Sequence, residues 1–175
     1  MAKTDKIDIV IGIDPDVDRS GFALLDSRTR KFDLRALSFP DLLDALKTVQ
    51  RKCEVAGRSL TVVVEAGWLN ESNWHLSHRE SRAEAAAKGN AVGRNHETGR
   101  KICEMCDHWD IPVVRKKPLP LKSRGVHFWN GKDGKITAEE LKALTGYEKR
   151  TNQEMRDAAL LAWTHADLPI VVRPK

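Results

Sequence analysis

The sequence predicts an α/β domain built on a mixed sheet, and three observations support this prediction. Two apolar runs of strand length, IDIVIGID at residues 7–14 and LTVVVE at residues 60–65, are typical of buried strands. Segments with apolar residues at helical spacing follow each of them. At 175 residues and 41% hydrophobic content, the chain can bury one core, so residues 1–175 are expected to form a single domain.

The first half of the chain predicts four strands and one helix. Turn residues separate the first three strands, which are expected over residues 7–14, 21–26 and 31–38. A helix is expected over residues 41–55, because its apolar residues recur every three or four positions and Gly57 can end it. The β-branched run at residues 60–65 is the fourth strand.

The second half predicts three helices and one further strand. A helix is expected from Arg82 to Trp109, with possible breaks at Gly89, Gly93 and Gly99. The IPVVR segment predicts a fifth strand, and two prolines after it predict a loop. The remaining helices are expected after an N-cap at Thr137 and over residues 153–167. Residues 70–82 are polar and carry no clear pattern.

Four acidic residues stand where apolar segments begin or end. Asp14 ends the first apolar run and Glu65 ends the fourth predicted strand, while Glu154 and Asp157 lie three residues apart on one face of the last helix. The two most apolar strands should be neighbours, so these carboxylates are expected to meet at one sheet edge. Such oxygen ligands suit Mg²⁺ or Mn²⁺, and two ions can polarise a phosphodiester and activate water. The pattern predicts a two-metal nuclease site.

Each acid also has an ordinary explanation when it is considered alone. An aspartate at a strand end is often a turn residue, and acids near a helix N-terminus interact favourably with the helix dipole. The combination of the acids favours a metal site over these explanations. Asp16 and Asp18 lie in the turn after Asp14 and are expected to hydrogen-bond their own backbone there.

The charge of the chain favours a polyanionic partner. The formal net charge is +5, and residues 115–135 hold seven cations against the single acid Asp133. His127, Phe128 and Trp129 are interleaved with these cations and can stack on bases, although a solvated loop is the alternative. The predicted nucleic-acid contacts in this stretch are Arg115, Lys116, Lys117, Lys122, Arg124 and Lys135.

The cysteines and the N-terminus limit the other possibilities. Three cysteines argue against a disulfide framework, and Cys103, Cys106 and His108 lack the second ligand pair of a recognisable zinc site, so buried thiols are expected. The sequence shows no apolar signal segment and no stretch long enough to span a bilayer. A cytoplasmic protein with no membrane partner and no small-molecule cofactor is expected.

With these residues placed, the chain resembles the RuvC-type Holliday junction resolvases of the ribonuclease H-like superfamily. IGIDPDVDRSGFALL looks like the opening strand, turn and strand of the family, and TVVVEAGW resembles its fourth strand. KGNAVGRNHETGRKI is similar to the small-residue helix near the dimer interface, and EMRDAALLAWTHA is similar to the C-terminal helix. The likeness covers most of the chain.

The resemblance implies a ribonuclease H-like fold with a five-stranded mixed sheet flanked by helices. It implies a homodimer that cuts branched DNA, most specifically four-way junctions, leaving a 5′ phosphate and a 3′ hydroxyl. It places the catalytic and metal-binding roles on Asp14, Glu65, Glu154 and Asp157. In this scheme Asp14 bridges two Mg²⁺ or Mn²⁺ ions, Glu65 and Asp157 each complete one coordination sphere, and Glu154 binds directly or through water.

The resemblance also implies roles for residues that contact DNA. Trp68 matches an aromatic position that the family inserts at the crossover, whereas the sequence without the family would favour a core-edge residue. Arg94 lies on the small-residue helix and is a further predicted nucleic-acid contact, and Lys122 and Lys135 fall near lysines that approach the scissile phosphate. Asp16 departs from the family, which usually has glycine there.

Three alternatives stay open. The first is a nuclease of the same fold with another substrate, such as RNA, a hybrid or flap DNA. The second is a nucleic-acid-binding protein that does not cut, which the four acids disfavour. The third is an actin-like kinase or ATPase with a similar opening Gly-x-Asp loop, which the chain length disfavours because that architecture needs two such domains.

Overall fold

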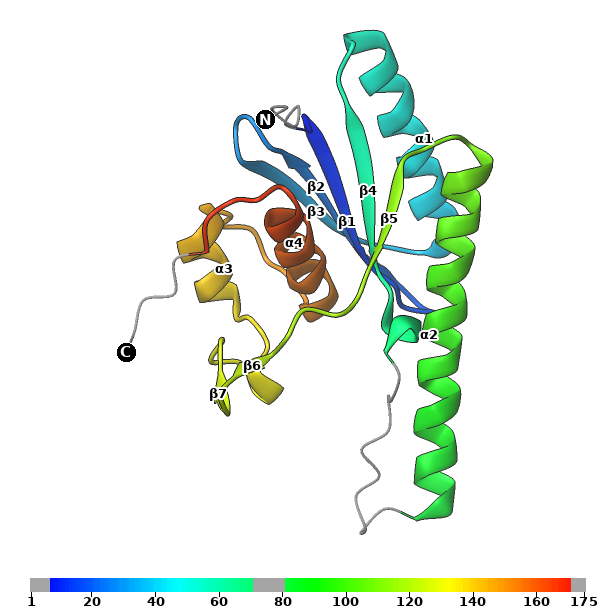
Figure 1. Ribbon diagram of the computed structural model, residues 1–175, viewed down its shortest axis with the longest axis vertical. Helices are drawn as coiled ribbons and strands as arrows, with labels where there is room; N and C mark the ends of the chain where they lie inside the picture. Colours follow the sequence, from blue (N-terminus) through cyan, green and yellow to red (C-terminus); the bar gives the residue numbers. More distant parts are fainter. Residues whose placement is uncertain (1–6, 71–80, 171–175) are drawn as a thin grey trace.

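The computed structural model describes residues 7–70 and 81–170, and its centre is a five-stranded mixed sheet (Figure 1). The sheet order is β3-β2-β1-β4-β5, with β1–β2 and β2–β3 antiparallel and β1–β4 and β4–β5 parallel. The strands are β1 (Ile9–Asp14), β2 (Ser20–Asp26), β3 (Lys31–Leu37), β4 (Leu60–Glu65) and β5 (Val113–Lys116). The predicted fold class and the central positions of β1 and β4 are confirmed.

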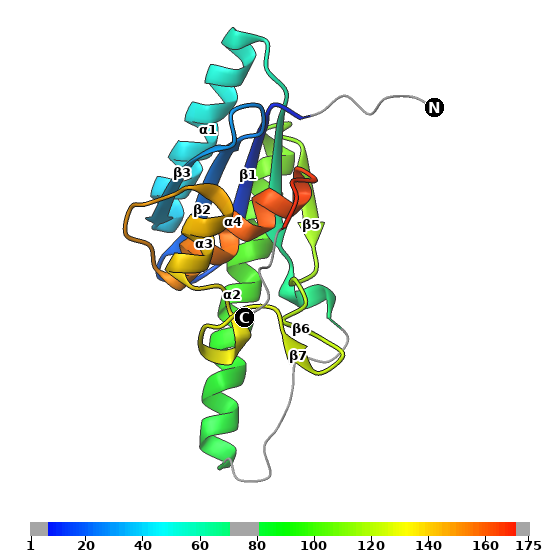
Figure 2. The same cartoon turned by 90° about the vertical axis from the view of Figure 1, so that its left-hand side faces the viewer.

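Helices cover both faces of this sheet. The pair α1 (Phe39–Ala56) and α2 (Arg82–His108) lies on one face, while α4 (Gln153–His165) lies on the other with α3 (Ala138–Thr145) beside it (Figures 1 and 2). Two short 3-10 turns complete the order, η1 (Gly67–Leu69) directly after β4 and η2 (Lys132–Gly134) before α3. Among the described residues, no helix has the length and apolar character required to cross a membrane.

The core follows from the alternation of side chains along the strands. Ile11 and Ile13 on β1 pack with Leu46 and Ile102 of the first helix pair, and all four are completely buried. Val10 on the same strand points to the opposite face, where it packs with residues of α4. Because both faces are covered, β1 and β4 are apolar at nearly every position, which explains the unbroken hydrophobic runs in the sequence.

The helix boundaries come from local capping. Ser81 and Glu84 form a reciprocal capping box at the start of α2, and Thr137 and Glu140 form the predicted one at α3. The prediction of possible breaks in the second helix was wrong, because α2 continues through its three glycines for 27 residues. Isolated glycines lower helix propensity without ending a helix, and packing of the C-terminal half of α2 on the sheet outweighs that effect.

A small second sheet was not predicted. After β5, where two prolines predicted a loop, β6 (Lys122–Ser123) and β7 (Val126–His127) form a hairpin. Arg124 and Gly125 make its two-residue turn with φ angles of 50° and 83°, as a type I′ turn requires. The strands have only two residues each, too few to show a period in the sequence.

The cysteines are buried thiols, as predicted. Cys53, Cys103 and Cys106 are all free and buried. Burial raises the pKa of the Cys106 thiol to about 12, so this sulfur stays protonated at neutral pH. A neutral, enclosed thiol is a poor ligand for zinc, which binds the thiolate.

Candidate metal centre and nucleic-acid interface

The first two acids meet because their strands are paired in parallel. Ile13 of β1 lies opposite Val64 of β4, and the residues that follow them are Asp14 and Glu65. Parallel strands end at the same sheet edge, so the two carboxylates leave neighbouring strands at equivalent positions. Open α/β sheets typically bind ligands at this carboxyl edge. This relationship confirms the expected convergence of the two strand ends.

Two glycines bring the third element to the same edge. A Cβ added at Gly12 would collide with the carbonyl oxygen of Ala158, and one added at Gly21 would collide with that of Glu154. The backbone of α4 therefore rests directly on β1 and β2, closer than any side chain would allow. Glu154 and Asp157 lie in the first part of this helix, on the side of the sheet edge that carries Asp14.

The electrostatics of Asp14 show that the four acids share one site. Burial raises the pKa of the Asp14 carboxyl well above its ordinary value. Neighbouring negative charges raise it further, and they belong, in order of effect, to Glu65, Asp157 and Glu154. The Lys135 ammonium acts in the opposite direction. A carboxyl surrounded by three others favours a bound proton or a bound cation.

Lys135 is the cation that this cluster holds. Its Nζ donates a hydrogen bond to Asp157 Oδ2 at 2.7 Å, and Gln153 Nε2 donates to Asp157 Oδ1, also at 2.7 Å. Burial alone would lower the pKa of Lys135, but the hydrogen bond to Asp157 and the surrounding negative charge outweigh it and raise the pKa. Burial, followed by the charge of Asp157, raises the pKa of Glu65, and Lys135 opposes this effect.

The donor set fits a hard divalent cation in its chemistry. All four acidic groups supply carboxylate oxygens, the ligands that Mg²⁺ and Mn²⁺ prefer. Within residues 7–70 and 81–170, however, no three His, Cys, Asp or Glu side chains already stand in positions that would hold a metal ion. Asp157 engages both of its oxygens with Lys135 and Gln153 instead. Each of these oxygens keeps a second lone pair, so Asp157 can bind an ion beside these partners or in exchange for one of them.

Two pockets flank the acidic cluster. The first has a volume of about 180 Å³ and is bounded by Asp14 and Glu65 on one side and by Trp68, Asn95 and His96 on the other. The second, of about 160 Å³, has Glu65, Asp157 and Lys135 on one wall and apolar residues on the other. These apolar residues are Pro118, Leu119, Leu121, Trp129, Ile136 and Leu160. Glu65 lines both pockets, so each of them opens beside the carboxylates.

Trp68 is partly buried rather than free at the surface. Its ring packs so tightly on α2 that a Cβ at Gly99 would lie 2.5 Å from an indole carbon. Arg100 places its guanidinium 5.5 Å from the ring centroid, and His96 contacts the ring edge-on with centroids 6.2 Å apart. In this position the indole belongs to the side wall of the pocket. Its insertion into DNA would require it to leave α2.

The turn after Asp14 is fixed by α2. Asp16 Oδ1 accepts hydrogen bonds from the backbone of Asp18 and Arg19, which confirms the predicted backbone-capping role of Asp16. Asn95 accepts from the Val17 amide at 3.0 Å and donates to Asp16 Oδ2 at 3.2 Å.

Sequence reasoning missed Asn95, His96 and Gln153 as site residues, because their roles depend on contacts between distant segments.

The predicted DNA-contacting cations lie in several environments. Arg115 forms an ion pair with Asp107, and Lys116 stands opposite Glu65 in the β4–β5 register. Arg94 lies on the exposed first part of α2. Lys117, Lys122 and Arg124 are exposed on the segment that carries the hairpin.

One prediction for the basic stretch was wrong. Trp129 is 8% exposed and packs in the core beneath α4, so its ring does not face the solvent where bases would stack. Phe128, its neighbour, is 37% exposed. The alternation of side chains along an extended segment explains why one aromatic ring is buried and the next is not.

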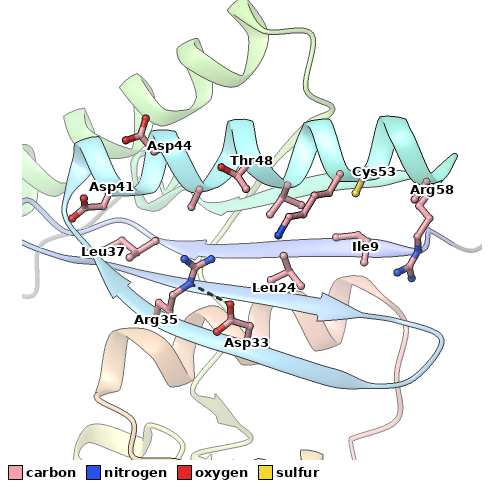
Figure 3. Close-up of a pocket in the computed structure, with 14 residues that line it drawn as sticks. Ile9, Leu24, Asp33, Arg35, Leu37, Asp41, Asp44, Thr48, Cys53 and Arg58 are labelled. Atoms are coloured by element: carbon pink, nitrogen blue, oxygen red, sulfur yellow. Dashed lines mark ion pairs between the residues drawn. The ribbon is translucent and has the colours of Figure 1, made fainter.

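A hollow larger than these two pockets lies away from the acidic cluster. A groove of about 820 Å³ lies between α1 and the β1–β3 part of the sheet, where Figure 3 shows Asp33 paired with Arg35 and Asp41 and Asp44 on the helix. These charges are spread along the groove, and its acids contribute nothing to the pKa of Asp14. Convergence of carboxylates, rather than volume, identifies the candidate metal centre.

Comparisons with known proteins agree with this architecture. No family model matches the chain, and no curated protein matches it at a significant level. Among solved structures, RuvC of T. thermophilus in complex with a Holliday junction substrate superposes with a TM-score of 0.51 at 18% identity, over 90% of this chain and 92% of that one. A Fowlpox virus resolvase bound to Holliday junction DNA covers 91% of this chain and 97% of its own, at 9% identity and a TM-score of 0.39, too low to support an argument. The chain therefore shares its fold with this RuvC structure, which is the ribonuclease H-like fold that the sequence predicted.

Proposed function

We propose that the protein is a metal-dependent endonuclease that hydrolyses phosphodiesters in branched DNA, with four-way junctions as the preferred substrate. One observation carries the proposal: at the carboxyl edge of the sheet, burial and then the charges of Glu65, Asp157 and Glu154, which come from β4 and α4, raise the pKa of Asp14 on β1. A cluster of acids at such an edge needs a cation, and the basic surface around it favours a polyanionic substrate.

The residues that would hold the metal are the four acids. Asp14 would be the central ligand because the charges of all three other carboxylates act on it, while Asp157 also acts on Glu65. Glu154 has the weakest effect on Asp14 among the three, which suits a water-mediated contact. When bound, a pair of divalent ions would lower the pKa of an attacking water and stabilise the leaving 3′ oxygen.

The other residues of the site prepare it for a phosphate. Lys135 neutralises Asp157 before an ion is present, and its ammonium can then turn to a non-bridging phosphate oxygen without leaving the site. Gln153 retains its hydrogen bond to Asp157 and fixes that carboxylate during this exchange. Hydrolysis would leave a 5′ phosphate and a 3′ hydroxyl.

A homodimer forms part of the proposal. In Figure 1 the first half of α2 extends beyond the sheet, with no described element drawn beside it. Most of its residues between Arg82 and Thr98 are exposed, and they include several alanines and Val92. A helix that projects alone gains no packing energy, so a second copy against this face would explain its length. A two-fold symmetric junction also requires two active sites.

The deciding experiment is cleavage of a mobile four-way junction, an RNA–DNA hybrid and a flap, each with Mg²⁺ and with Mn²⁺. We expect paired nicks in opposing strands of the junction and slower cutting of the other two substrates. Asp14→Asn should reduce cleavage by about three orders of magnitude, because it removes the central ligand, and should leave junction binding intact. The matched control is Asp18→Asn, an exposed acid of the same turn that should cut like the parent.

The same assay separates the alternatives. Cutting of the hybrid or the flap in preference to the junction would transfer the proposal to that substrate. Binding without cutting in either metal would indicate a protein that only binds nucleic acid. Full activity of Asp14→Asn would reject the assignment of the site.

A further inference from the structure

We propose that one face of the β6–β7 hairpin receives unstacked nucleobases of the substrate beside the carboxylates. This face, called the hairpin face below, consists of Leu121, Val126 and Phe128. The inference rests on the proposed function and deepens it, because it assigns the part of the protein that holds the branch open. It draws on the register of the hairpin, the exposure of its apolar side chains and their continuity with the acidic site.

The register places the three apolar side chains on one side. Ser123 pairs with Val126 across the hairpin, and the Phe128 amide donates to the Leu121 carbonyl at 3.1 Å. Side chains alternate along each strand and agree in direction across a pair. Leu121, Val126 and Phe128 therefore point the same way, while Lys122 and its partner His127 point the other way.

The opposite side of the hairpin contacts η2 through His127, although His127 and Lys122 are themselves exposed. His127 lies directly on Gly134, where an added Cβ would collide with the imidazole. Gly134 is buried and precedes Lys135, the lysine of the acidic site. His127 is thus directed at η2, and the hairpin face is directed away from it.

The hairpin face is exposed to an unusual extent. Val126 is 70% exposed, Leu121 is 41% exposed and Phe128 is 37% exposed. These are three of the eight large hydrophobic residues that are exposed in the described part of the chain, and they lie within eight consecutive positions. An exposed apolar cluster of this kind commonly marks a binding surface.

The hairpin face continues into the candidate metal centre. Leu121 also lines the 160 Å³ pocket whose other wall is formed by Glu65, Asp157 and Lys135. Trp129, next to Phe128, is buried in the same pocket wall and anchors the base of the hairpin. A base that leaves its stack next to a phosphate held at the carboxylates would come to rest on this apolar strip.

The charges around the hairpin face indicate nucleic acid as the occupant. Lys117, Lys122 and Arg124 are exposed on the same segment and can contact backbone phosphates on both sides of an apolar centre. Apolar residues flanked by cations are the combination with which proteins wedge open base steps and hold single-stranded bases. Trp68, by comparison, is packed against α2 and forms the opposite wall of the site.

The test compares the parent with Val126→Ser/Phe128→Ser, which removes two of the three apolar side chains of the hairpin face and keeps every cation. The matched control is Val55→Ser, since Val55 is 91% exposed on α1. A junction with 2-aminopurine next to the branch point is mixed with each protein in EDTA, and the fluorescence increase reports unstacking. The double variant should bind with a Kd within about threefold of the parent, because phosphate contacts dominate affinity. Its fluorescence increase should fall by about fivefold and its cleavage rate by about tenfold, while Val55→Ser behaves as the parent.

A second measurement maps the contact directly. With 5-iodouracil at the same position, photocrosslinks should form on the peptide that carries Val126 and Phe128. Crosslinks confined to the peptide with Trp68, or a parental fluorescence increase in the double variant, would overturn the proposal. If the parent cuts the junction without unstacking the probe, the proposal for the hairpin face fails, while the proposed nuclease function is retained. If the parent neither binds nor cuts branched DNA, the proposed function fails and the inference fails with it.

Discussion

The Lys135 ammonium lies 2.7 Å from Asp157 Oδ2, inside a group of four carboxylates. This contact gives the site a cation before any metal binds. The charge of Lys135 offsets part of the rise in the pKa values of Asp14 and Glu65. Asp157 is mostly shielded from solvent, with a side chain that is 16% exposed. The protonation of the cluster therefore depends on a lysine that is distant in sequence from all four acids.

Replacement of Lys135 by methionine should make metal binding more dependent on high pH. Without the ammonium, the pKa values of Asp14 and Glu65 rise further, so protons compete with the metal over a wider range. We expect the pH at half-maximal Mn²⁺ binding to increase by about one unit, measured by calorimetry. Lys132→Met, at an exposed lysine of the same segment, should leave this pH unchanged, and an equal shift in both variants would contradict the argument.

Metal affinity of the unaltered protein should itself rise with pH. The pKa of Asp14 is raised, so its carboxyl holds a proton at pH values where an ordinary aspartate is ionised. A protonated carboxyl does not bind a metal ion, and each ion must therefore displace protons. Calorimetry with Mn²⁺ in buffers of different ionisation enthalpy should show proton release that decreases from pH 5.5 to pH 8. Absence of any proton release at pH 5.5 would contradict the raised pKa.

Asp14→Asn should stabilise the protein at neutral pH when no metal is present. A folded pKa above the unfolded value means that Asp14 contributes stability below the unfolded pKa, and that this contribution is lost as pH rises through the folded pKa. At pH 7.5 the ionised carboxylate is unfavourable, and the amide removes that cost. We expect a Tm increase of about 3 °C in EDTA by circular dichroism, for about 1 kcal/mol. The increase should shrink at pH 5 and be absent in Asp18→Asn.

Gly21→Ala should displace α4 and disable the site. The new methyl group would collide with the carbonyl of Glu154, which is backbone and cannot rotate away. We expect destabilisation of about 2 kcal/mol, a Tm decrease of about 6 °C, and loss of most cleavage. Gly93→Ala is the control, because its Cβ would meet nothing within 4 Å on the exposed part of α2. This control should be neutral or stabilising by up to about 1 kcal/mol.

Trp68→Ala should lower the stability of the protein. The ring fills the space over Gly99 and is partly buried, so its removal leaves a cavity against α2. We expect a loss of about 2 kcal/mol, less than for a fully buried tryptophan, measured by urea denaturation. Trp68→Phe should recover most of this loss. If the Trp68→Ala protein had the stability of the parent, the indole would not be packed against α2 in solution.

Most of the fold was predictable because both central strands are buried on two faces. Burial forces continuous apolar runs on β1 and β4, and such runs are visible without a structure. The acids were predictable for the same reason, since Asp14 and Glu65 end those runs. The hairpin was not, because two-residue strands show no period, and the burial of Trp129 depends on α4, which comes later in the chain. Asn95 and Gln153 look like ordinary polar helix residues until their partners from other segments are placed beside them.

The close approach at Gly12 and Gly21 has a consequence for protein engineering. If the four acids were transplanted onto another sheet with a covering helix, they would lie too far apart. Side chains with a β-carbon on the strands would increase the distance between the helix backbone and the sheet. A functional graft would also have to carry the two positions without a β-carbon, which set the spacing of the helix above the strands.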